Sequence, residues 1–426
     1  MYQIEGSGQV LRSRDKRARL RLSRPKVSQV VLMLGLTSMF TDISSEMVSS
    51  ILPMYLVLNL HLSPFAFGVL DGIYLGGAAF VRLISGFLAD KSRRHKEIAA
   101  AGYALSAVSR LGLLVVGGVW TLLASVILLD RLGKGIRTAP RDAMISLSTE
   151  PEKLGTAFGV HRAMDTAGAM IGPLIAFGLL TLTPDSYDTI FIVSLCFAVI
   201  GVGVIGLFVQ NPPNVAAKAG EPAATPSLRA ALSLARDARF GPLLIVGGAL
   251  SLATMSDGFL YLTLQRRLDF NVGLFPLLYV ATALVFMLLA IPMGQLADRF
   301  GRARIFFGGY AVLLAVYALL LLPWYGAAQV IVSLVLLGVY YAATDGVLMA
   351  LASALLPEDL RTSGLALLTT VTNLGRLAAS ALFGLLWTWQ GMSVAIWIFI
   401  VGLGVATLLT GWLFALPRHR GAARGI

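Results

Sequence analysis

Long runs of apolar residues recur along this sequence, and they constrain its fold more than any other feature. Examples are residues 241–256, 273–293 and 394–416. A helix of about 20 apolar residues crosses the roughly 30 Å hydrocarbon core of a membrane. Charged residues are only 13% of the chain, about half the share usual in a soluble domain. We therefore expect a helical membrane protein, since a membrane barrel would show alternating segments of about ten residues.

Hydropathy predicts twelve spans and divides the chain into two bundles. The spans are expected at 29–58, 66–89, 97–119, 121–147, 154–181, 189–210, 241–264, 273–296, 303–322, 328–355, 361–388 and 393–416. Residues 1–28 form a basic arm without a signal-peptide cleavage site. The Pro- and Ala-rich segment 211–240 is predicted to be a linker between six-helix bundles at 29–210 and 241–416. Residues 417–426 form a short tail.

The placement of the basic residues predicts the topology. The net charge of +12 is concentrated beside the apolar runs, which indicates a membrane protein with lipid contact and no nucleic-acid partner. A cytoplasmic arm, linker and tail satisfy the positive-inside rule in a plasma membrane or bacterial inner membrane. Arg266 and Arg267 fall on the opposite side, where they could snorkel to lipid headgroups.

The two bundles carry related sequences. GFLADKSRR begins at Gly86 and GQLADRFGR at Gly294, 208 residues later. PEKLGTAF begins at Pro151 and PEDLRTSG at Pro357, 206 residues later. Two repeats that face each other across a central cavity are typical of transporters. The expected fold is therefore all-α, with twelve transmembrane helices in two pseudo-symmetric six-helix bundles.

The span 121–147 holds an unusual number of charges: Asp130, Arg131, Lys134, Arg137, Arg141 and Asp142. Its repeat counterpart, 328–355, is almost entirely apolar, so both segments are expected to cross the membrane. Four of the charges fall within about 60° of one another on one helix face: Asp130, Lys134, Arg137 and Arg141. A central Lys or Arg facing lipid costs roughly 2.5–3.5 kcal/mol. The face must therefore point into the protein or toward water, with Asp130 and Lys134 paired at i,i+4.

Ionisable residues in the other spans complete the set of candidates. Each could be a buried salt-bridge partner, but charges inside a membrane are usually functional. Carboxylates there can exchange protons, and the proton-coupling candidates are Asp42, Glu46, Asp130 and Asp165. The substrate-cavity candidates are Arg131, Lys134, Arg137, His161, Arg162, Asp257, Asp345 and Arg376.

With these features the chain resembles the Major Facilitator Superfamily over essentially its whole length. The family's loop motif G-x-L-x-D-R-x-G-R is matched in the second half by Gly294, Leu296, Asp298, Arg299, Gly301 and Arg302. The first half matches it at Gly86, Leu88, Asp90, Lys91 and Arg94, with Arg93 in the position of the glycine. The resemblance implies a cytoplasmic gate in which the aspartate caps helices of the other bundle and the arginines clamp it.

Two further motifs carry the resemblance. The fourth-helix pattern R-x-x-Q-G is similar to Arg131, Lys134 and Gly135, with Lys in place of Gln. This substitution suggests a more cationic cavity and an anionic or zwitterionic solute. The fifth-helix pattern G-x-x-x-G-P is similar to Gly168, Gly172 and Pro173, which implies close helix packing and, within the family, proton-coupled export.

The sequence thus predicts a secondary active transporter that exports a drug or metabolite in exchange for protons. Proton-coupled uptake of an organic anion is the alternative, and a membrane receptor that does not transport is a third hypothesis. No enzyme motif is present, such as HExxH, GxSxG or a phosphate-binding glycine loop. We expect no cofactor and no bound metal. The expected partners are a small-molecule substrate, protons and lipid, and the expected oligomeric state is a monomer.

Overall fold

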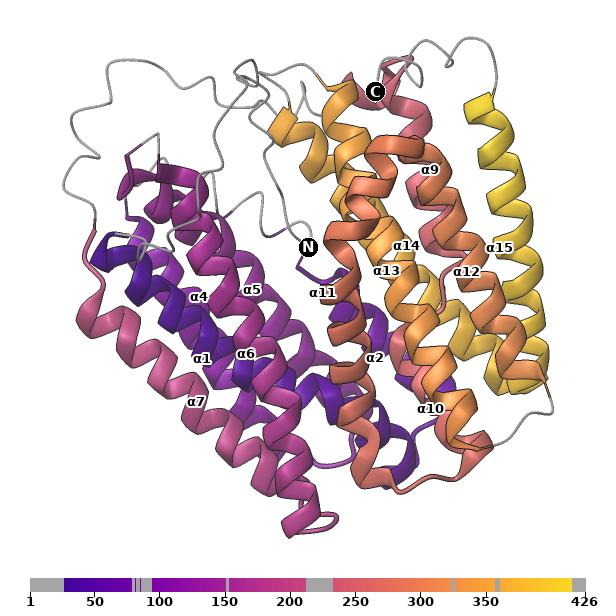
Figure 1. Cartoon of the computed structure of the whole chain (residues 1–426). Coiled ribbons are helices and arrows are strands. Elements are labelled where there is room, and N and C mark those ends of the chain that lie inside the picture. The colour runs from indigo at the N-terminus through magenta and orange to yellow at the C-terminus, as the bar shows by residue number, and fades with distance from the viewer. Residues whose placement is uncertain are drawn as a thin grey trace, which may run out of the picture.

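The computed structural model describes residues 27–78, 81, 85, 94–150, 153–211, 233–322, 326–356 and 361–415. In these ranges every regular element is a helix (Figure 1). The first bundle contains α1 (Gln29–Met54), η1 (Tyr55–Asn59), α2 (Pro64–Gly76), α4 (His95–Val115), α5 (Trp120–Leu147), α6 (Leu154–Leu182) and α7 (Tyr187–Phe208). The second contains η4 (Leu234–Arg236), α9 (Phe240–Leu252), α10 (Asp257–Leu268), η5 (Val272–Leu274), α11 (Phe275–Phe300), α12 (Arg302–Leu321), α13 (Ala327–Leu355), α14 (Arg361–Gln390) and α15 (Met392–Ala415).

These helices confirm the predicted membrane architecture. In the described residues, ten segments are long and apolar enough to cross a membrane. The charged helix α5 and the short helix α2 complete the twelve predicted spans. Helix α5 is continuous over 28 residues, which is long enough to span a bilayer. The predicted arm, apart from residues 27 and 28, and the predicted tail lie outside the described residues, and so do residues 212–232 of the predicted linker.

Two helical bundles stand side by side (Figure 1). In the first, α1 packs against α6 and α7, and α4 packs against α5. In the second, α13 packs against α11 and α12, and α9 packs against α14. The bundles meet where α2 lies against α14 and where α6 lies against α11.

The contact between α2 and α14 is close because glycines face the neighbouring backbone. A Cβ atom added at Gly68 would lie 2.5 Å from the carbonyl oxygen of Ser380, and one at Gly72 would lie 2.7 Å from that of Leu377. Only glycine permits such an approach. The Ser380 hydroxyl also donates to Asp71 at 2.6 Å. This contact joins the two bundles on the side that holds the α1–α2 connection.

The seventh span is interrupted, which the sequence analysis did not predict. Helix α9 ends at Leu252, and α10 begins at Asp257 with Ser256 as its N-cap. The hydroxyl of Ser256 accepts from the backbone N–H of Phe259 at 3.5 Å. The backbone N–H of Met255 donates to the hydroxyl of Tyr317 at 2.7 Å. Side-chain oxygens therefore satisfy the polar backbone exposed by the break.

The two arginines that were predicted to lie on the side opposite the termini have protein partners. Arg266 and Arg267 occupy the last turn of α10, where positive charge complements the helix dipole. The Arg266 guanidinium lies 5.3 Å from the ring centroid of Trp387. Arg267 donates to the carbonyl of Leu322 at 3.3 Å.

Candidate functional site

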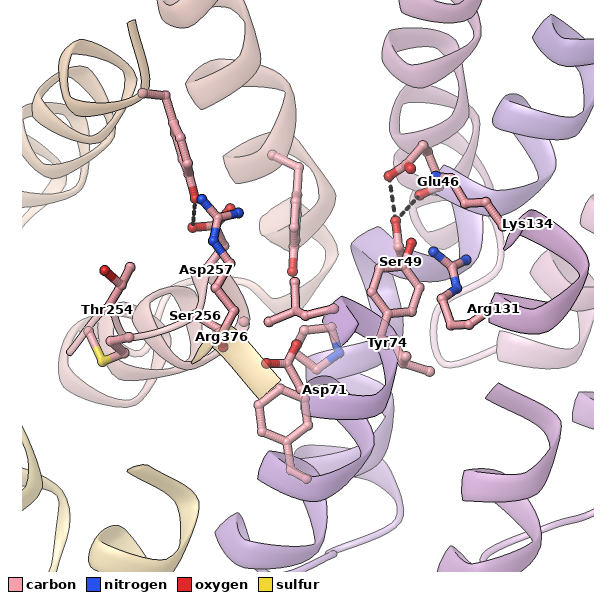
Figure 2. A pocket seen from close by; sticks show the side chains of 18 residues that line it. Glu46, Ser49, Asp71, Tyr74, Arg131, Lys134, Thr254, Ser256, Asp257 and Arg376 are labelled. Atoms are coloured by element: carbon pink, nitrogen blue, oxygen red, sulfur yellow. Dashed lines mark hydrogen bonds between the residues drawn. The ribbon is translucent and has the colours of Figure 1, made fainter. Parts of the chain in front are cut away.

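A cavity of about 270 Å³ lies between the two bundles (Figure 2). Both bundles contribute to its wall, and many of the contributed side chains are polar or charged. The lining residues are Glu46, Ser49, Leu52, Pro53, Phe67, Asp71, Tyr74, Leu75, Arg131, Lys134, Thr254, Met255, Ser256, Asp257, Gly258, Tyr279, Tyr341 and Arg376. The helix break at 253–256 faces this cavity. Broken helices of this kind line the solute sites of membrane transporters.

One side of the cavity is formed by α1 and α5. The Arg131 guanidinium stacks on Tyr74, 3.8 Å from its ring centroid. Lys134, on the next turn of α5, has no carboxylate within ion-pair distance among the described residues. Glu46 is held by the Ser49 hydroxyl, which donates to it at 2.6 Å. This side therefore presents an ammonium group with no bound counter-ion.

The opposite side is formed by α10, α13 and α14, with Asp71 of α2 between the two sides (Figure 2). The hydroxyl of Tyr341 donates to Asp257 at 2.5 Å. The Arg376 guanidinium lies 3.7 Å from Asp345, which does not itself line the cavity. Of the predicted residues, Glu46, Arg131, Lys134, Asp257 and Arg376 therefore meet in one cavity.

Asp130 lies behind this cavity in a buried ion cluster. Arg110 of α4 donates to it at 2.9 Å, and the neighbouring Arg131 also donates to it. All three side chains are buried. The predicted i,i+4 pair of Asp130 with Lys134 is wrong. The carboxylate turns toward α4, where two guanidinium groups satisfy it better than one flexible ammonium.

Arg137 holds a second carboxylate of α1. Its guanidinium lies 3.8 Å from Asp42, donates to Ser106 at 2.8 Å and sits 4.8 Å from the ring centroid of Tyr103. Asp42 and Glu46, both predicted to be proton-coupling candidates, lie one turn apart on α1. Glu46 lines the cavity and binds Ser49, whereas Asp42 lies beside Arg137. The two carboxylates therefore have different partners although they are one turn apart on α1.

A third polar cluster surrounds Arg141. This guanidinium donates to Asp142 at 2.8 Å and to Ser38 at 3.1 Å, and it lies 3.8 Å from Asp165. The buried His161 lies 3.5 Å from Asp165 and hydrogen bonds to Ser38 at 3.2 Å. Asp165 is 7% exposed, and its Oδ1 atom has no hydrogen-bond partner among the described residues.

The predicted charged face of α5 is thus confirmed as internal. Asp130, Arg137 and Arg141 are all less than 8% exposed. None of these three lines the central cavity, and the same holds for Asp42, His161 and Asp165. Arg162 lies beside His161 on α6, also outside the cavity lining.

The loop motif of the second half binds within its own bundle. Arg302 donates to Asp298 at 3.1 Å, one turn away, and reaches the carbonyl of Ala350 at 3.5 Å. Gly301 has φ +98°, a conformation that favours glycine and that makes the turn between α11 and α12. Gly294 lies within α11, and Arg299 is exposed in its last turn. The clamp on the other bundle that the resemblance implied is absent from these described contacts.

The loop motif of the first half falls mostly outside the described residues, including Gly86 and Asp90. Arg94 is described, as the exposed residue before α4.

The glycines of the fifth-helix motif pack α6 onto α1. A Cβ added at Gly168 would lie 2.5 Å from the carbonyl oxygen of Met39, and one at Gly172 would lie 2.7 Å from that of Ile43. The same added Cβ atoms would lie 3.2 Å from the Cβ of Asp42 and 3.1 Å from the Cβ of Glu46. The motif therefore places α6 directly against the carboxylate-bearing turns of α1. Pro173 follows inside the continuous helix α6.

Sequence reasoning missed several polar residues of the site. Asp71 and Arg110 lie in predicted apolar spans, and a test for isolated charges would have found both. The tyrosines Tyr74, Tyr279 and Tyr341 were missed because aromatic residues in a span do not distinguish a cavity wall from a lipid-facing surface.

Comparisons with known proteins agree with this architecture. The Major Facilitator Superfamily profile matches residues 34–290 and 253–425. An uncharacterised MFS-type transporter of Methanocaldococcus jannaschii is 32% identical over 372 residues, covering 85% of this chain and 89% of that protein. A point mutant of the nucleoside transporter NupG superposes with a TM-score of 0.78 at 15% identity, covering 90% of this chain and 100% of that chain. A bacterial homologue of the lysosomal transporter Spinster, inward-facing and occupied, gives 0.69 at 13% identity over 92% and 97% of the two chains.

The family consists of membrane transporters rather than enzymes, in agreement with the expected function class. The chain belongs to the Major Facilitator Superfamily.

Proposed function

We propose that this protein moves a small organic solute across the membrane in exchange for protons, by alternating access. The observation that carries the proposal is the charged cavity between the bundles. Ionisable groups at membrane depth are costly unless they are paired or line a pathway. Here Lys134 lines the cavity and has no carboxylate within ion-pair distance among the residues that the structure describes, which supports a role in binding solute.

Asp165 is the proposed proton carrier. A buried carboxylate oxygen without a hydrogen-bond partner is energetically costly, and a proton on that carboxyl group would lower the cost. Arg141 and His161 beside it provide groups that respond to a change in its charge. The tight packing of α6 on α1 would couple such a change to Asp42 and Glu46.

The predicted topology indicates on which side of the membrane the cavity is closed. If the linker is cytoplasmic, the contact between α2 and α14 closes the cavity toward the outside, and this structure is an inward-facing state. Export is supported by the motif at Gly168, Gly172 and Pro173. Uptake of an organic anion is the second candidate, and the free ammonium group of Lys134 favours it.

The test uses purified protein in liposomes that contain a pH-sensitive dye. With no gradient imposed, a panel of organic anions, zwitterions, nucleosides and cationic drugs is added outside. Antiport predicts that an active solute makes the lumen more alkaline, as external solute exchanges for internal protons. Asp165→Asn should abolish this change. Asp185→Asn is the matched control because Asp185 is exposed and its positive φ of 61° suits asparagine.

Other outcomes would replace the proposal. Acidification of the lumen would indicate symport and favour uptake. Solute movement without a pH change would indicate uniport. If no solute moved in either direction, the hypothesis of a receptor that does not transport would gain support.

A further inference from the structure

We propose that the solute is a small zwitterion, held with its anionic group toward Lys134 and Arg131 and its cationic group toward Asp71 and Asp257. This inference rests on the proposed transport function and specifies its substrate class. It follows from the net charge of the two sides of the cavity. The net charge of each side includes the lining residues and the buried residues that pair with them.

The α5 side carries a surplus of positive charge. Arg131 is neutralised by Asp130, but Asp130 is also bound by Arg110 at 2.9 Å, so this three-residue cluster keeps one net positive charge. Lys134 adds another. Glu46 is the carboxylate that lines this side; it is bound by the Ser49 hydroxyl, and its negative charge reduces the surplus on this side to one positive charge. An anionic group of the solute would therefore find favourable charge here.

The opposite side carries a surplus of negative charge. Asp257 lines it, and Asp71 lies between this side and the α5 side (Figure 2); both carboxylates accept hydrogen bonds from neutral hydroxyls, those of Tyr341 and Ser380. Arg376 is the cation of this side, and Asp345 already lies 3.7 Å from it, behind the cavity wall. Two carboxylates thus belong to this side against one guanidinium, and a cationic group of the solute would be stabilised between Asp257 and Asp71.

The two sides belong to one small space. The cavity of about 270 Å³ is at the lower limit of ligand pockets, so a small solute would reach both sides at once. Figure 2 shows Lys134 and Arg131 on one side, Asp257 on the other and Asp71 between them. The rings of Tyr74 and Tyr279 provide apolar wall for the carbon chain between the charges.

The test measures binding of ω-amino acids with three to eight carbons to the full-length protein in detergent. Each is compared with the alkanoate and the alkylamine of the same length, which lack one of the two charges. Ligand-observed NMR gives the affinities, and the length series finds the best charge separation. We expect the best zwitterion to bind at least about tenfold more tightly than either comparison compound, because it forms one more charged contact.

Two variants test which charged end of the ligand binds Lys134 and which binds Asp257. Lys134→Gln should weaken the zwitterion and the alkanoate about tenfold to a hundredfold, and change the alkylamine less than about twofold. Asp257→Asn should weaken binding of the zwitterion and the alkylamine about tenfold to a hundredfold, and change binding of the alkanoate less than about twofold. The matched controls are Lys153→Gln, an exposed lysine, and Asp269→Asn, an exposed residue after α10 with φ +44°. Both should bind as the wild type does.

Equal affinity for a zwitterion and for its alkanoate or alkylamine would overturn the inference, as would no binding by any member of the series. A Lys134→Gln effect on the alkylamine as large as that on the alkanoate would also overturn it. The liposome panel separates this failure from failure of the proposed function. Transport of a solute with one charge or none would leave the transport proposal standing and remove the zwitterion, whereas no transport of any solute would remove the transport proposal itself.

Discussion

The two bundles place different chemistry at the same positions of one repeat. Helices α4 and α12 begin at His95 and Arg302, and α5 and α13 begin at Trp120 and Ala327. Subtracting gives a shift of 207 residues for both pairs. These two pairs of helices can therefore be compared residue by residue at this shift, which lies between the shifts of 208 and 206 of the two sequence motifs.

This comparison pairs cations of the first bundle with tyrosines of the second. Arg110 corresponds to Tyr317, and Lys134 corresponds to Tyr341. Arg110 binds the carboxylate of Asp130, whereas the hydroxyl of Tyr317 accepts from the backbone at the helix break. Lys134 and Tyr341 both line the cavity.

The difference indicates that the two bundles use different chemistry to satisfy buried polar groups. A tyrosine satisfies a polar partner while burying a large apolar ring, so it avoids most of the desolvation cost of a charge. Charges bear that cost, yet they can respond to protons and ionic solutes. At these two positions the first bundle therefore holds permanent or ionisable cations, whereas the second uses neutral hydroxyls, one of which supports the broken helix.

The largest effect on stability is expected at the buried ion cluster. Arg110→Leu removes the bonds to Asp130, Ser44 and Ser45 and leaves a buried carboxylate partly unpaired. We expect a loss of about 3 kcal/mol or more in the free energy of unfolding, measured by SDS titration in mixed micelles.

The comparison variant for this prediction is Asp345→Asn in the second bundle. Its pair with Arg376 spans 3.7 Å, and the two side chains are 30% and 26% exposed. The expected loss is about 1 kcal/mol or less. Equal losses for the two variants would show that the bundles do not differ in how strongly they depend on ion pairs.

A smaller effect is expected from two glycines at equivalent positions, Gly102 and Gly309. A Cβ on Gly102 would lie 2.7 Å from the backbone N of Arg137 and from the carbonyl oxygen of Gly133, so α4 and α5 would have to separate. We expect Gly102→Ala to cost about 1–3 kcal/mol. The unfolding free energy measures this cost.

Gly309→Ala is the matched control. Its new Cβ would meet a side-chain methyl of Thr344 at 2.6 Å and the Cβ of Ala343 at 3.0 Å, whereas the nearest backbone atom lies 3.5 Å away. Rotation of the Thr344 side chain relieves the shorter contact, and a shift of a few tenths of an ångström relieves the contact with Ala343. Alanine also gains about 1 kcal/mol of helix propensity over glycine. The net change should lie within about 1 kcal/mol of zero. A larger loss at Gly309 than at Gly102 would contradict the idea that the first bundle is packed more closely here.

The next effect concerns the tyrosine that supports the helix break. Tyr317→Phe removes the acceptor of the Met255 N–H and leaves a buried donor unpaired. The expected loss is about 1–2 kcal/mol. Tyr187→Phe is the control, because Tyr187 is also buried but its hydroxyl has no recorded hydrogen-bond partner among the described residues. Amide hydrogen exchange of 253–256 should rise in Tyr317→Phe alone, and unchanged exchange there would refute the supporting role.

Sequence patterns predicted the spans and the internal face of α5 because both follow from local periodicity. The hydrophobic repeat of a helix sets which residues share a face, and the cost of a charge in lipid determines that the charged face points inward. The partner of Asp130 could not be predicted in this way. Arg110 is 20 residues away on another helix, and only the packing of α4 on α5 brings the two together.

The helix break and the loop motif show two other limits. Ser256 followed by Asp257 is a helix-start signal. It lies within an apolar run, so hydropathy predicts one continuous span there. The loop motif was expected to clamp the other bundle, yet Asp298 and Arg302 pair within one helix turn. A motif names residues that can bind one another. Which bundle they bind depends on the conformational state, and that is not encoded in local spacing.

The smallest effect is expected at this loop pair. Asp298→Asn removes an ion pair of 3.0 Å in which Asp298 is 63% exposed. Water and salt screen such a pair, so the free energy of unfolding should change by about 0.5 kcal/mol or less. Asp130→Asn, the same change in the buried cluster of the first bundle, should cost several times more. If Asp298→Asn were equally destabilising, the loop would bind a partner beyond Arg302, and the contrast between the buried ion cluster of the first bundle and the exposed ion pairs of the second would no longer hold.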